Sequence, residues 1–258
     1  MEKSFKRQCP KMNIVMPISN TVADFLNLPV FVVNLAIATN RFHTVAPRIQ
    51  QAGFKNIFRY LGIHGANHSQ RITAYATLGN PRITQKDIWF LHSAGRQGCL
   101  LSHLLLWRQM IEQNIPVAVV LEDDVCFHSR WEEILPEYVE KIPQDVDLVY
   151  LGCQFRQSST GKIVDKIECI TTHAYVVTLE GAKILFDTLM NEPDGLSTLD
   201  EMIHYKVMKP RKINWATFDS QYPEYEDPKV KQMPPDFQYR ACGLIFQDPA
   251  FPTLIERY

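Results

Sequence analysis

The stretch Pro116-Val-Ala-Val-Val-Leu-Glu-Asp-Asp-Val-Cys-Phe127 decides the fold of this chain. Its residues 117–121 form an unbroken apolar run that is mostly β-branched and too short for a helix. Such a run is typical of a strand buried on both faces, as in the middle of a parallel sheet. Three carboxylates follow it directly: Glu122, Asp123 and Asp124. Because ligands of open α/β sheets bind beyond the carboxyl ends of the strands, we expect these acids to line a ligand crevice.

Three successive carboxylates at a crevice favour a bound cation. Two carboxylates about 4 Å apart repel each other by roughly 4 kcal/mol at an effective dielectric constant near 20. Hard oxygen ligands without a neighbouring thiolate or histidine cluster suit Mg²⁺ or Mn²⁺, which usually hold a substrate phosphate as well. In an extended strand, Glu122 and Asp124 would point to one face and Asp123 to the other. The alternative is a solvated acidic turn that precedes a helix over residues 131–139.

Composition narrows the class of protein. The chain has 258 residues, with 27 Lys and Arg against 28 Asp and Glu, so its formal net charge is −1. This balance does not suggest a surface for polyanions, and nucleic acid is not an expected partner. The N-terminus lacks the apolar core of a signal peptide, and no window approaches the ~20 apolar residues of a membrane span. We therefore expect a cytoplasmic protein.

The cysteines also indicate a reducing compartment such as the cytoplasm. They show no paired metal-ligand spacing, and several lie in apolar runs, which is typical of reduced core thiols rather than of a disulfide framework. They are Cys9, Cys99, Cys126, Cys153, Cys169 and Cys242.

The first half of the chain has the pattern of a nucleotide-binding unit. Residues 1–28 are predicted to be an N-terminal extension, and residues 29–258 one domain. A buried-strand run at 30–33, a helix at 41–51 with Gly53 as its C-terminal cap, and a strand at 57–61 form a βαβ unit.

The rest of the chain is predicted to alternate between helices, strands and two longer polar segments. Residues 66–95 are polar and are interpreted as a loop with one short helix, and residues 219–237, rich in Pro and acidic residues, are predicted to form a long surface loop. The other predicted elements are a helix from Gly98 to about Asn114, strands at 147–151, 174–178 and 244–246, and helices at 131–139, 181–190 and 198–208.

Several separated motifs occur together and in order between residues 30 and 256. The helix motif Gly98-Cys-Leu-Leu-Ser-His-Leu-Leu-Leu-Trp107 and the acidic motif Leu121-Glu-Asp-Asp-Val125 are the most specific. The others are Val30 to Leu35 followed by Arg41, Phe58 to Gly65, Asp147 to Gly152, Thr172 to Ala182, Leu199 to Glu201, Ile245 to Gln247 and Thr253 to Ile255. Together they resemble glycosyltransferase family 25, although this family usually has Asp where this chain has His64.

The resemblance implies a GT-A fold, one α/β domain with a mixed central sheet flanked by helices. It also implies a metal-dependent, inverting hexosyltransferase that uses a UDP-sugar donor, with galactose or glucose transferred, and Mn²⁺ or Mg²⁺ as cofactor. Known members build bacterial lipooligosaccharide or glycosylate collagen hydroxylysine. The expected acceptor is therefore a hydroxyl of a glycan, a lipooligosaccharide or a protein.

The resemblance also assigns candidate site residues. Asp124 is the expected metal ligand, with Glu122 and Gln247 as further ligands. The donor nucleotide is expected to contact Asn34, Arg41, Glu122, Asp123, Ser102, His103 and His173. Each has a structural alternative, such as a turn residue for Asn34, a solvated helix residue for Arg41 or a satisfied core histidine for His103.

Inversion requires a carboxylate on the face of the sugar opposite the leaving diphosphate, and the candidates are Asp200 and Glu201. Thr198-x-x-Glu201 has the spacing of a capping box, which would give Glu201 a structural role. We therefore expect Asp200 to be the general base.

Two other functions compete with this interpretation. One is a non-catalytic relative that binds nucleotide-sugar or carbohydrate, which the departure at His64 permits. The other is a Mg²⁺-dependent phosphohydrolase, disfavoured because the chain has neither an Asp-x-Asp-x-Thr nucleophile motif nor a Gly-x-x-x-x-Gly-Lys phosphate loop.

Overall fold

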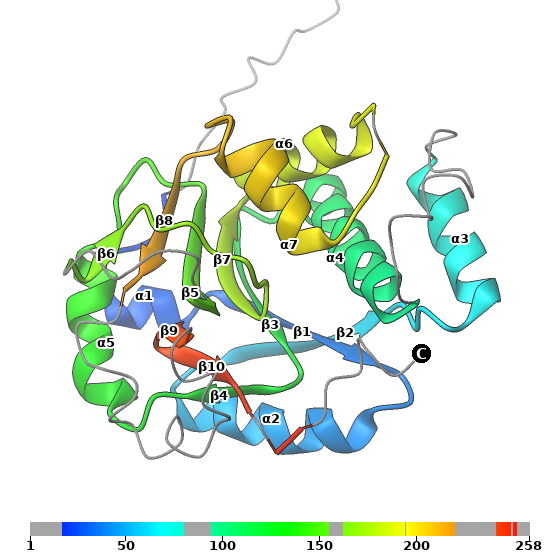
Figure 1. Ribbon diagram of the computed structural model, residues 1–258. Helices are drawn as coiled ribbons and strands as arrows, with labels where there is room; N and C mark the ends of the chain where they lie inside the picture. The colour runs from blue at the N-terminus through cyan, green and yellow to red at the C-terminus, as the bar shows by residue number, and fades with distance from the viewer. Residues whose placement is uncertain are drawn as a thin grey trace, which may run out of the picture.

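The fold is built on one mixed sheet. A computed structural model describes residues 17–79, 94–154, 162–193, 195–219, 241–248 and 250–251. The sheet has the strand order β2-β1-β3-β7-β5-β8-β6, and β9 pairs with β5 off this path. This mixed sheet with helices on both faces confirms the expected fold class (Figure 1).

The predicted βαβ unit is confirmed at one end of the sheet. Strands β1 (Pro29–Leu35) and β2 (Asn56–Gly62) are parallel and are connected through helix α2 (Thr39–Gln51). Gly53, with φ of 96°, follows the end of α2 in a left-handed conformation that glycine adopts without strain.

The apolar run that opened the sequence analysis is the central strand β3 (Val117–Glu122). Residues Val117–Leu121 are buried, since β3 pairs in parallel with β1 and antiparallel with β7 (Ala174–Thr178). The prediction of a strand buried on both faces is confirmed. Its surroundings are mixed rather than purely parallel.

The second half of the chain completes the sheet and adds a small ribbon. Strand β5 (Leu148–Gln154) lies between β7 and β8 (Trp215–Phe218), with β6 (Val164–Asp165) and β9 (Ala241–Gly243) beside them. A separate antiparallel pair joins β4 (Val125–Phe127) to β10 (Ile245–Gln247) and places Gln247 opposite Val125. This pairing brings the C-terminal part of the chain next to the acidic motif.

Two hydrophobic cores cover the two faces of the sheet. One lies under α3 (His68–Leu78), α4 (Ala94–Gln113), α6 (Leu179–Met190), α7 (Leu199–Met202) and the π-helix Ile203–Met208. The other lies under α1 (Val22–Leu26), α2 and α5 (Trp131–Glu140). Figure 1 shows α4, α6 and α7 on one side of the sheet and α1, α2 and α5 on the other. Ile18 and Phe25, from the expected N-terminal extension, are buried in the second core.

The long predicted elements are found, whereas several short ones were missed. Helix α4 begins at Ala94, before the predicted Gly98, and the helix predicted at 198–208 is α-helical only to Met202 and then a π-helix. The missed elements are α1, β4, β6, β8 and β9, whereas α3 is a helix within residues 66–95, where one short helix was expected. The loop predicted at 219–237 lies outside the described residues except for Asp219.

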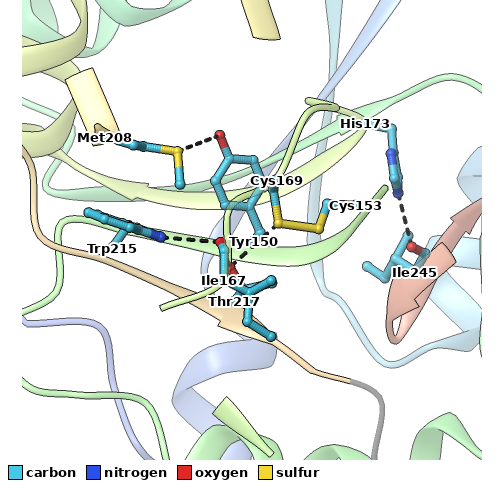
Figure 2. Close-up of a disulfide and its surroundings, with 9 residues drawn as sticks. All are labelled: Tyr150, Cys153, Ile167, Cys169, His173, Met208, Trp215, Thr217 and Ile245. Carbon is cyan, nitrogen blue, oxygen red and sulfur yellow. Dashed lines mark hydrogen bonds between the residues drawn. A yellow bond between two sulfur atoms is a disulfide. The ribbon is translucent and has the colours of Figure 1, made fainter. Parts of the chain in front are cut away.

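The expectation of reduced thiols is wrong for one pair of cysteines. Cys153, on β5, forms a disulfide with Cys169, 16 residues later, with a Cα–Cα distance of 5.7 Å. Figure 2 shows the bond beside Thr217, whose hydroxyl donates to the Ile167 carbonyl over 3.1 Å. The partners adjoin in space only after β5 and β8 have paired, and sequence spacing does not reveal that. Cys99, by contrast, is a free thiol.

Within the described ranges, no helix has both the length and the apolar character needed to cross a membrane.

Breaking this disulfide should destabilise the protein. A closed loop of about 15 residues is worth about 3 kcal/mol through the entropy of the unfolded chain, so Cys153→Ser and Cys169→Ser should each lower the free energy of unfolding by about that amount. Guanidinium unfolding with and without reductant measures it. Reductant should lower wild type to the level of the variants and leave the variants unchanged. Cys99→Ser is the control, because Cys99 is a free thiol and the variant should keep the reductant sensitivity of wild type. Equal stability of wild type in both conditions would contradict the bond.

Candidate active site

A pocket opens at the carboxyl ends of β1 and β3 and is closed on another side by the first turns of α4. Its lining includes residues from separated motifs of the sequence. Among them are Arg41, Cys99, Ser102, His103, Glu122, Asp123, Asp124 and Gln247. The crevice predicted from the acidic stretch is therefore present, and most of the predicted site residues line it.

The three carboxylates line this one pocket, contrary to the expected alternation. Glu122 is the last residue of β3, and Asp123 and Asp124 form the turn that leads into β4. A turn breaks the two-residue period of an extended strand, so Asp123 is not directed to the opposite face. The alternation was expected only for an extended strand, and the turn after Glu122 removes that condition.

Arg41 binds two of the three acids. One of its guanidinium nitrogens lies 2.8 Å from Asp123 Oδ1 and 3.1 Å from Asp124 Oδ2, and its side chain is 12% exposed. Asn34 donates to Asp123 Oδ2 over 2.6 Å and accepts a hydrogen bond from Arg59 over 2.7 Å. The alternative of a solvated Arg41 is therefore wrong, and Asn34 belongs to the same buried polar network.

Burial makes these acids hard to ionise. It raises the pKa of Glu122 to about 8, with Asp124 and Asp123 adding to the effect, and it raises the pKa of Asp124 to about 6 against the attraction of Arg41. Burial also raises the pKa of Asp123. Three carboxylates beside one guanidinium leave an excess of negative charge once all are ionised.

The donor set fits a divalent cation. Asp124 Oδ1 is buried and has no hydrogen-bond partner in the described part of the chain, while Oδ2 is held by Arg41. Gln247 lines the same pocket from β10, and the backbone N–H of Asp248 donates to the Asp124 carbonyl over 2.5 Å. Carboxylate and amide oxygens are the ligands that Mg²⁺ and Mn²⁺ prefer.

A thiol and an imidazole lie next to Glu122; the sequence placed His103 in the donor site but did not indicate a thiol beside the acids. Ligand atoms of Cys99, His103 and Glu122 lie within 4.8 Å of one another. Their neighbourhood had a signal in the sequence: Cys99 and His103 are four residues apart, and this spacing places both on one face of α4. Burial raises the pKa of the Cys99 thiol and lowers the pKa of His103 to about 3.

Ser102 and His103 have different surroundings. The Ser102 hydroxyl donates to the Gly98 carbonyl over 2.6 Å and accepts from the Ile63 backbone N–H over 2.8 Å, which ties α4 to the end of β2. His103 contacts the Tyr175 hydroxyl through Nδ1 over 2.7 Å, and its Nε2 lies 4.0 Å from Glu122 Oε1. Ser102 thus has a full structural role, whereas one side of His103 faces the pocket.

The backbone after β2 packs tightly against the start of α4. A Cβ on Gly65 would lie 1.5 Å from the Ala94 carbonyl oxygen, and one on Gly98 would lie 2.4 Å from the Ile63 carbonyl oxygen. Only glycine permits this approach, and this explains why the helix motif begins with Gly98. The close backbone packing also sets the position of this wall of the pocket. His64, the departure from the family pattern, lies on that wall.

His173 lies behind the site rather than in it. Its Nε2 contacts the Ile245 carbonyl oxygen at 3.0 Å, and the residue is not among the described residues that line the pocket (Figure 2). Its backbone carbonyl accepts from the Glu122 N–H over 2.8 Å. The structure therefore gives His173 a role in holding β10 and the end of β3.

Asp200 and Glu201 stand in different environments, and neither is among the described residues that line the pocket. Asp200 is half-buried, and its charge raises the pKa of Cys99, as does that of Glu122. Glu201 is exposed and accepts from the Ser197 hydroxyl over 3.3 Å. The Thr198 side chain makes no capping hydrogen bond, so the predicted capping box is wrong: Ser197, one residue earlier, has become the partner of Glu201.

Comparisons with known proteins identify the class. The model of "Glycosyltransferase family 25 (LPS biosynthesis protein)" matches residues 27–171, more than half of the chain. Human procollagen galactosyltransferase 2 is 30% identical over 102 residues, which is 35% of this chain and 16% of that protein. A putative glycosyltransferase of Haemophilus influenzae is 27% identical over 130 residues, 45% of each chain. The chain thus spans less than half the length of these relatives.

This chain belongs to glycosyltransferase family 25. A solved glycosyltransferase that is involved in glycosylation of the major capsid of PBCV-1 aligns with 88% of this chain and 94% of its own, at 12% identity and a TM-score of 0.45. The mixed sheet with helices on both faces agrees with the GT-A fold that family membership predicts.

The raised pKa values predict how a cation and protons compete. A carboxyl whose pKa is raised on folding stabilises the fold below its unfolded pKa and loses this contribution as pH rises through the folded pKa. Stability without metal should therefore fall between about pH 4.5 and 8, the unfolded and folded pKa values of Glu122. Mn²⁺ should raise the Tm more at pH 8.5 than at pH 5.5, because only ionised carboxylates bind it well.

Thermal unfolding with Mn²⁺ or chelator at the two pH values measures this difference. Asp124→Asn should reduce the Mn²⁺ effect at pH 8.5, and Asp187→Asn, at an exposed carboxylate on α6, serves as the control. A shift of equal size at both pH values would contradict the role of these carboxylates.

Proposed function

We propose that this chain is a metal-dependent inverting glycosyltransferase that moves a hexose from a UDP-sugar to an acceptor hydroxyl. One observation carries the proposal: three carboxylates, two buried and one half-buried, lie at the end of the central strand, with a single guanidinium between two of them. Membership of a glycosyltransferase family supports the reaction class.

The cation site is assigned to Asp124, with Glu122 and Gln247 as further ligands. The unpaired Asp124 Oδ1 and the position of Gln247 on the pocket wall support this choice. When bound, Mn²⁺ or Mg²⁺ would neutralise the diphosphate as it leaves the sugar.

The donor nucleotide is assigned to the wall formed by β1 and α2. Asn34, Arg41 and Asp123 form one hydrogen-bonded network there, and Arg41 combines positive charge with a fixed position for a phosphate or ribose. Ser102 and His103 form the facing wall on α4. His173 would support the donor site from behind, through its backbone contact with Glu122.

The sugar and the acceptor are assigned from the relatives of this chain. The relative named for procollagen galactosylation supports galactose and a protein hydroxyl, whereas the family description supports a lipopolysaccharide-type glycan. Glucose is the second sugar, because one changed pocket contact shifts discrimination by only ~1–3 kcal/mol.

We assign Asp200 as the general base of a single displacement. The acceptor oxygen would attack the anomeric carbon while the bond from that carbon to the diphosphate oxygen breaks and UDP departs. The acceptor's proton would pass to an Asp200 oxygen, so charge and protons balance. Asp200 is half-buried and close enough to influence Cys99 electrostatically, whereas Glu201 is exposed, and this contrast favours Asp200.

UDP binding should depend on the metal through Asp124. Calorimetry with UDP in Mn²⁺, in Mg²⁺ and in chelator should show tight binding only with a metal, and Asp124→Asn should remove the difference. Asp187→Asn again serves as the control, since its exposed carboxylate lies on α6, outside the pocket lining. Equal affinity with metal and with chelator would reject the metal assignment.

Replacing the two candidate bases should have different effects. Asp200→Asn should leave UDP affinity nearly intact and lower transfer by roughly 10²–10⁴-fold, the usual loss for a general base. Glu201→Gln should change stability by about 1 kcal/mol or less and preserve transfer.

UDP release and product analysis with UDP-galactose and UDP-glucose measure both variants. Loss of transfer in a folded Glu201→Gln protein but not in Asp200→Asn would reverse the assignment. A product that keeps the donor's anomeric configuration would reject the single displacement. Metal-dependent UDP binding without transfer or hydrolysis would instead indicate a non-catalytic relative.

A further inference from the structure

His103 presents an unpaired ring nitrogen to the pocket. Its side chain is 0% exposed, and its Nε2 has no hydrogen-bond partner within the described residues. The nearest polar atom recorded for it is Glu122 Oε1, at 4.0 Å, and both residues line the pocket. A buried polar nitrogen without a partner costs about as much as a lost hydrogen bond, so a ligand atom is expected there.

Tyr175 determines which ring nitrogen of His103 carries the hydrogen. Trp107 Nε1 donates to the Tyr175 hydroxyl oxygen over 3.0 Å, because an indole nitrogen can only donate. The hydrogen of that hydroxyl needs a separate acceptor. Among the described residues, the one within hydrogen-bond distance is His103 Nδ1, at 2.7 Å. Tyr175 therefore donates to Nδ1, and the hydrogen of the neutral ring lies on Nε2.

This tautomer disfavours a transition metal between Cys99, His103 and Glu122. A metal on Nε2 would need the lone pair there, and the ring hydrogen would then move to Nδ1. The Tyr175 hydroxyl would receive two hydrogens and keep its own without an acceptor, in a fully buried position. The hydrogen-bond pattern thus indicates a donor N–H directed at Glu122 rather than a metal ligand.

A fixed N–H and a carboxyl oxygen 4.0 Å apart match a hydroxyl group. A hydroxyl oxygen can lie ~2.9 Å from the nitrogen and ~2.7 Å from the oxygen, accepting from His103 and donating to Glu122. A phosphate oxygen only accepts, and the ionised acids would repel it. Thr172 donates to the same Glu122 oxygen over 3.2 Å and holds it in place, which leaves the other oxygen for a cation.

We propose that His103 Nε2 and Glu122 Oε1 form a subsite for a hydroxyl of the donor sugar, with Tyr175 as the positioning residue that fixes the His103 tautomer. This proposal rests on the proposed function, because it assumes a sugar-nucleotide donor. It assigns His103 to the sugar rather than to the nucleotide, and it gives the Trp107 of the same helix motif a purpose, since its indole holds Tyr175.

Calorimetry with UDP, UDP-galactose and UDP-glucose in Mn²⁺ tests the subsite. The amide nitrogen of Gln reaches the place of Nε2, and that of Asn reaches the place of Nδ1. His103→Gln should therefore keep the gain in affinity that the sugar adds to UDP. In His103→Asn, affinity for the UDP-sugars should fall by about 10–100-fold. Affinity for UDP alone should be similar in wild type, His103→Gln and His103→Asn.

Nitrogen NMR of ¹⁵N-labelled protein tests the tautomer without ligand. In wild type, the His103 signals should show a protonated Nε2 and an unprotonated Nδ1, with His103→Gln identifying them by their loss. Tyr175→Phe should shift the Nδ1 signal and give a mixture of tautomers, which a purely structural role of the hydroxyl would not produce. Thermal unfolding shows whether each variant folds. If His103→Asn does not fold, the tautomer of the wild-type protein and the UDP-sugar affinity of His103→Gln test the subsite.

Distinct outcomes overturn the subsite and the proposed function. A wild-type hydrogen on Nδ1, or a Co²⁺–thiolate absorption band that Cys99→Ser abolishes, would overturn the subsite. A fall in UDP affinity equal to that for the UDP-sugars would show that His103 binds phosphate instead. Wild type that binds UDP but gains nothing from the sugar would overturn the subsite alone, and wild type that binds neither would overturn both.

Discussion

The contact of Arg41 with Asp123 and Asp124 is the interaction on which the site depends. Burying carboxylates side by side is unfavourable, and one guanidinium between two of them offsets part of that cost. The fold must therefore hold the first turn of α2 against the turn after β3, and the parallel pairing of β1 with β3 does so. The compensation is incomplete, since the pKa values of Glu122 and Asp124 stay raised. The charge left over makes the pocket suited to a cation.

The rest of the chain closes the pocket around this cluster. The β4–β10 ribbon brings Gln247 to the pocket, and Asp248 joins it to α2 through Arg48 over 2.5 Å. On the opposite wall, glycines at 65 and 98 allow α4 to approach the end of β2, which sets His103 and Cys99 beside Glu122. Elements far apart in sequence are thus held by backbone contacts, and the site inherits the rigidity of the sheet.

Sequence patterns predicted the central strand and the position of the pocket better than they predicted turns, the disulfide and individual side-chain contacts. Residues 117–121 were recognisable because burial on both faces demands an unbroken apolar run, and the acids that end the run marked the pocket. The turn at Asp123 and Asp124 was only the alternative interpretation, because an acidic pair is compatible with strand and turn alike. The Cys153–Cys169 bond and the partner of Glu201 depend on how separate segments pack, and no local pattern records that. His103 was identified by its motif, but its tautomer follows from Tyr175, 72 residues away.

The arrangement separates the charges that a displacement reaction needs. In the proposed mechanism, Glu122 and Asp124 would hold the cation beside the leaving diphosphate, and a bound cation would keep them from accepting the proton of the attacking hydroxyl. Asp200 lies on another element, and burial raises its pKa against the opposing effect of the Glu201 backbone N–H. A raised pKa moves a carboxylate towards the range in which it accepts protons efficiently near neutral pH. In the proposed mechanism, burial would thus favour a cation at the end of β3 and proton acceptance by Asp200 at the start of α7.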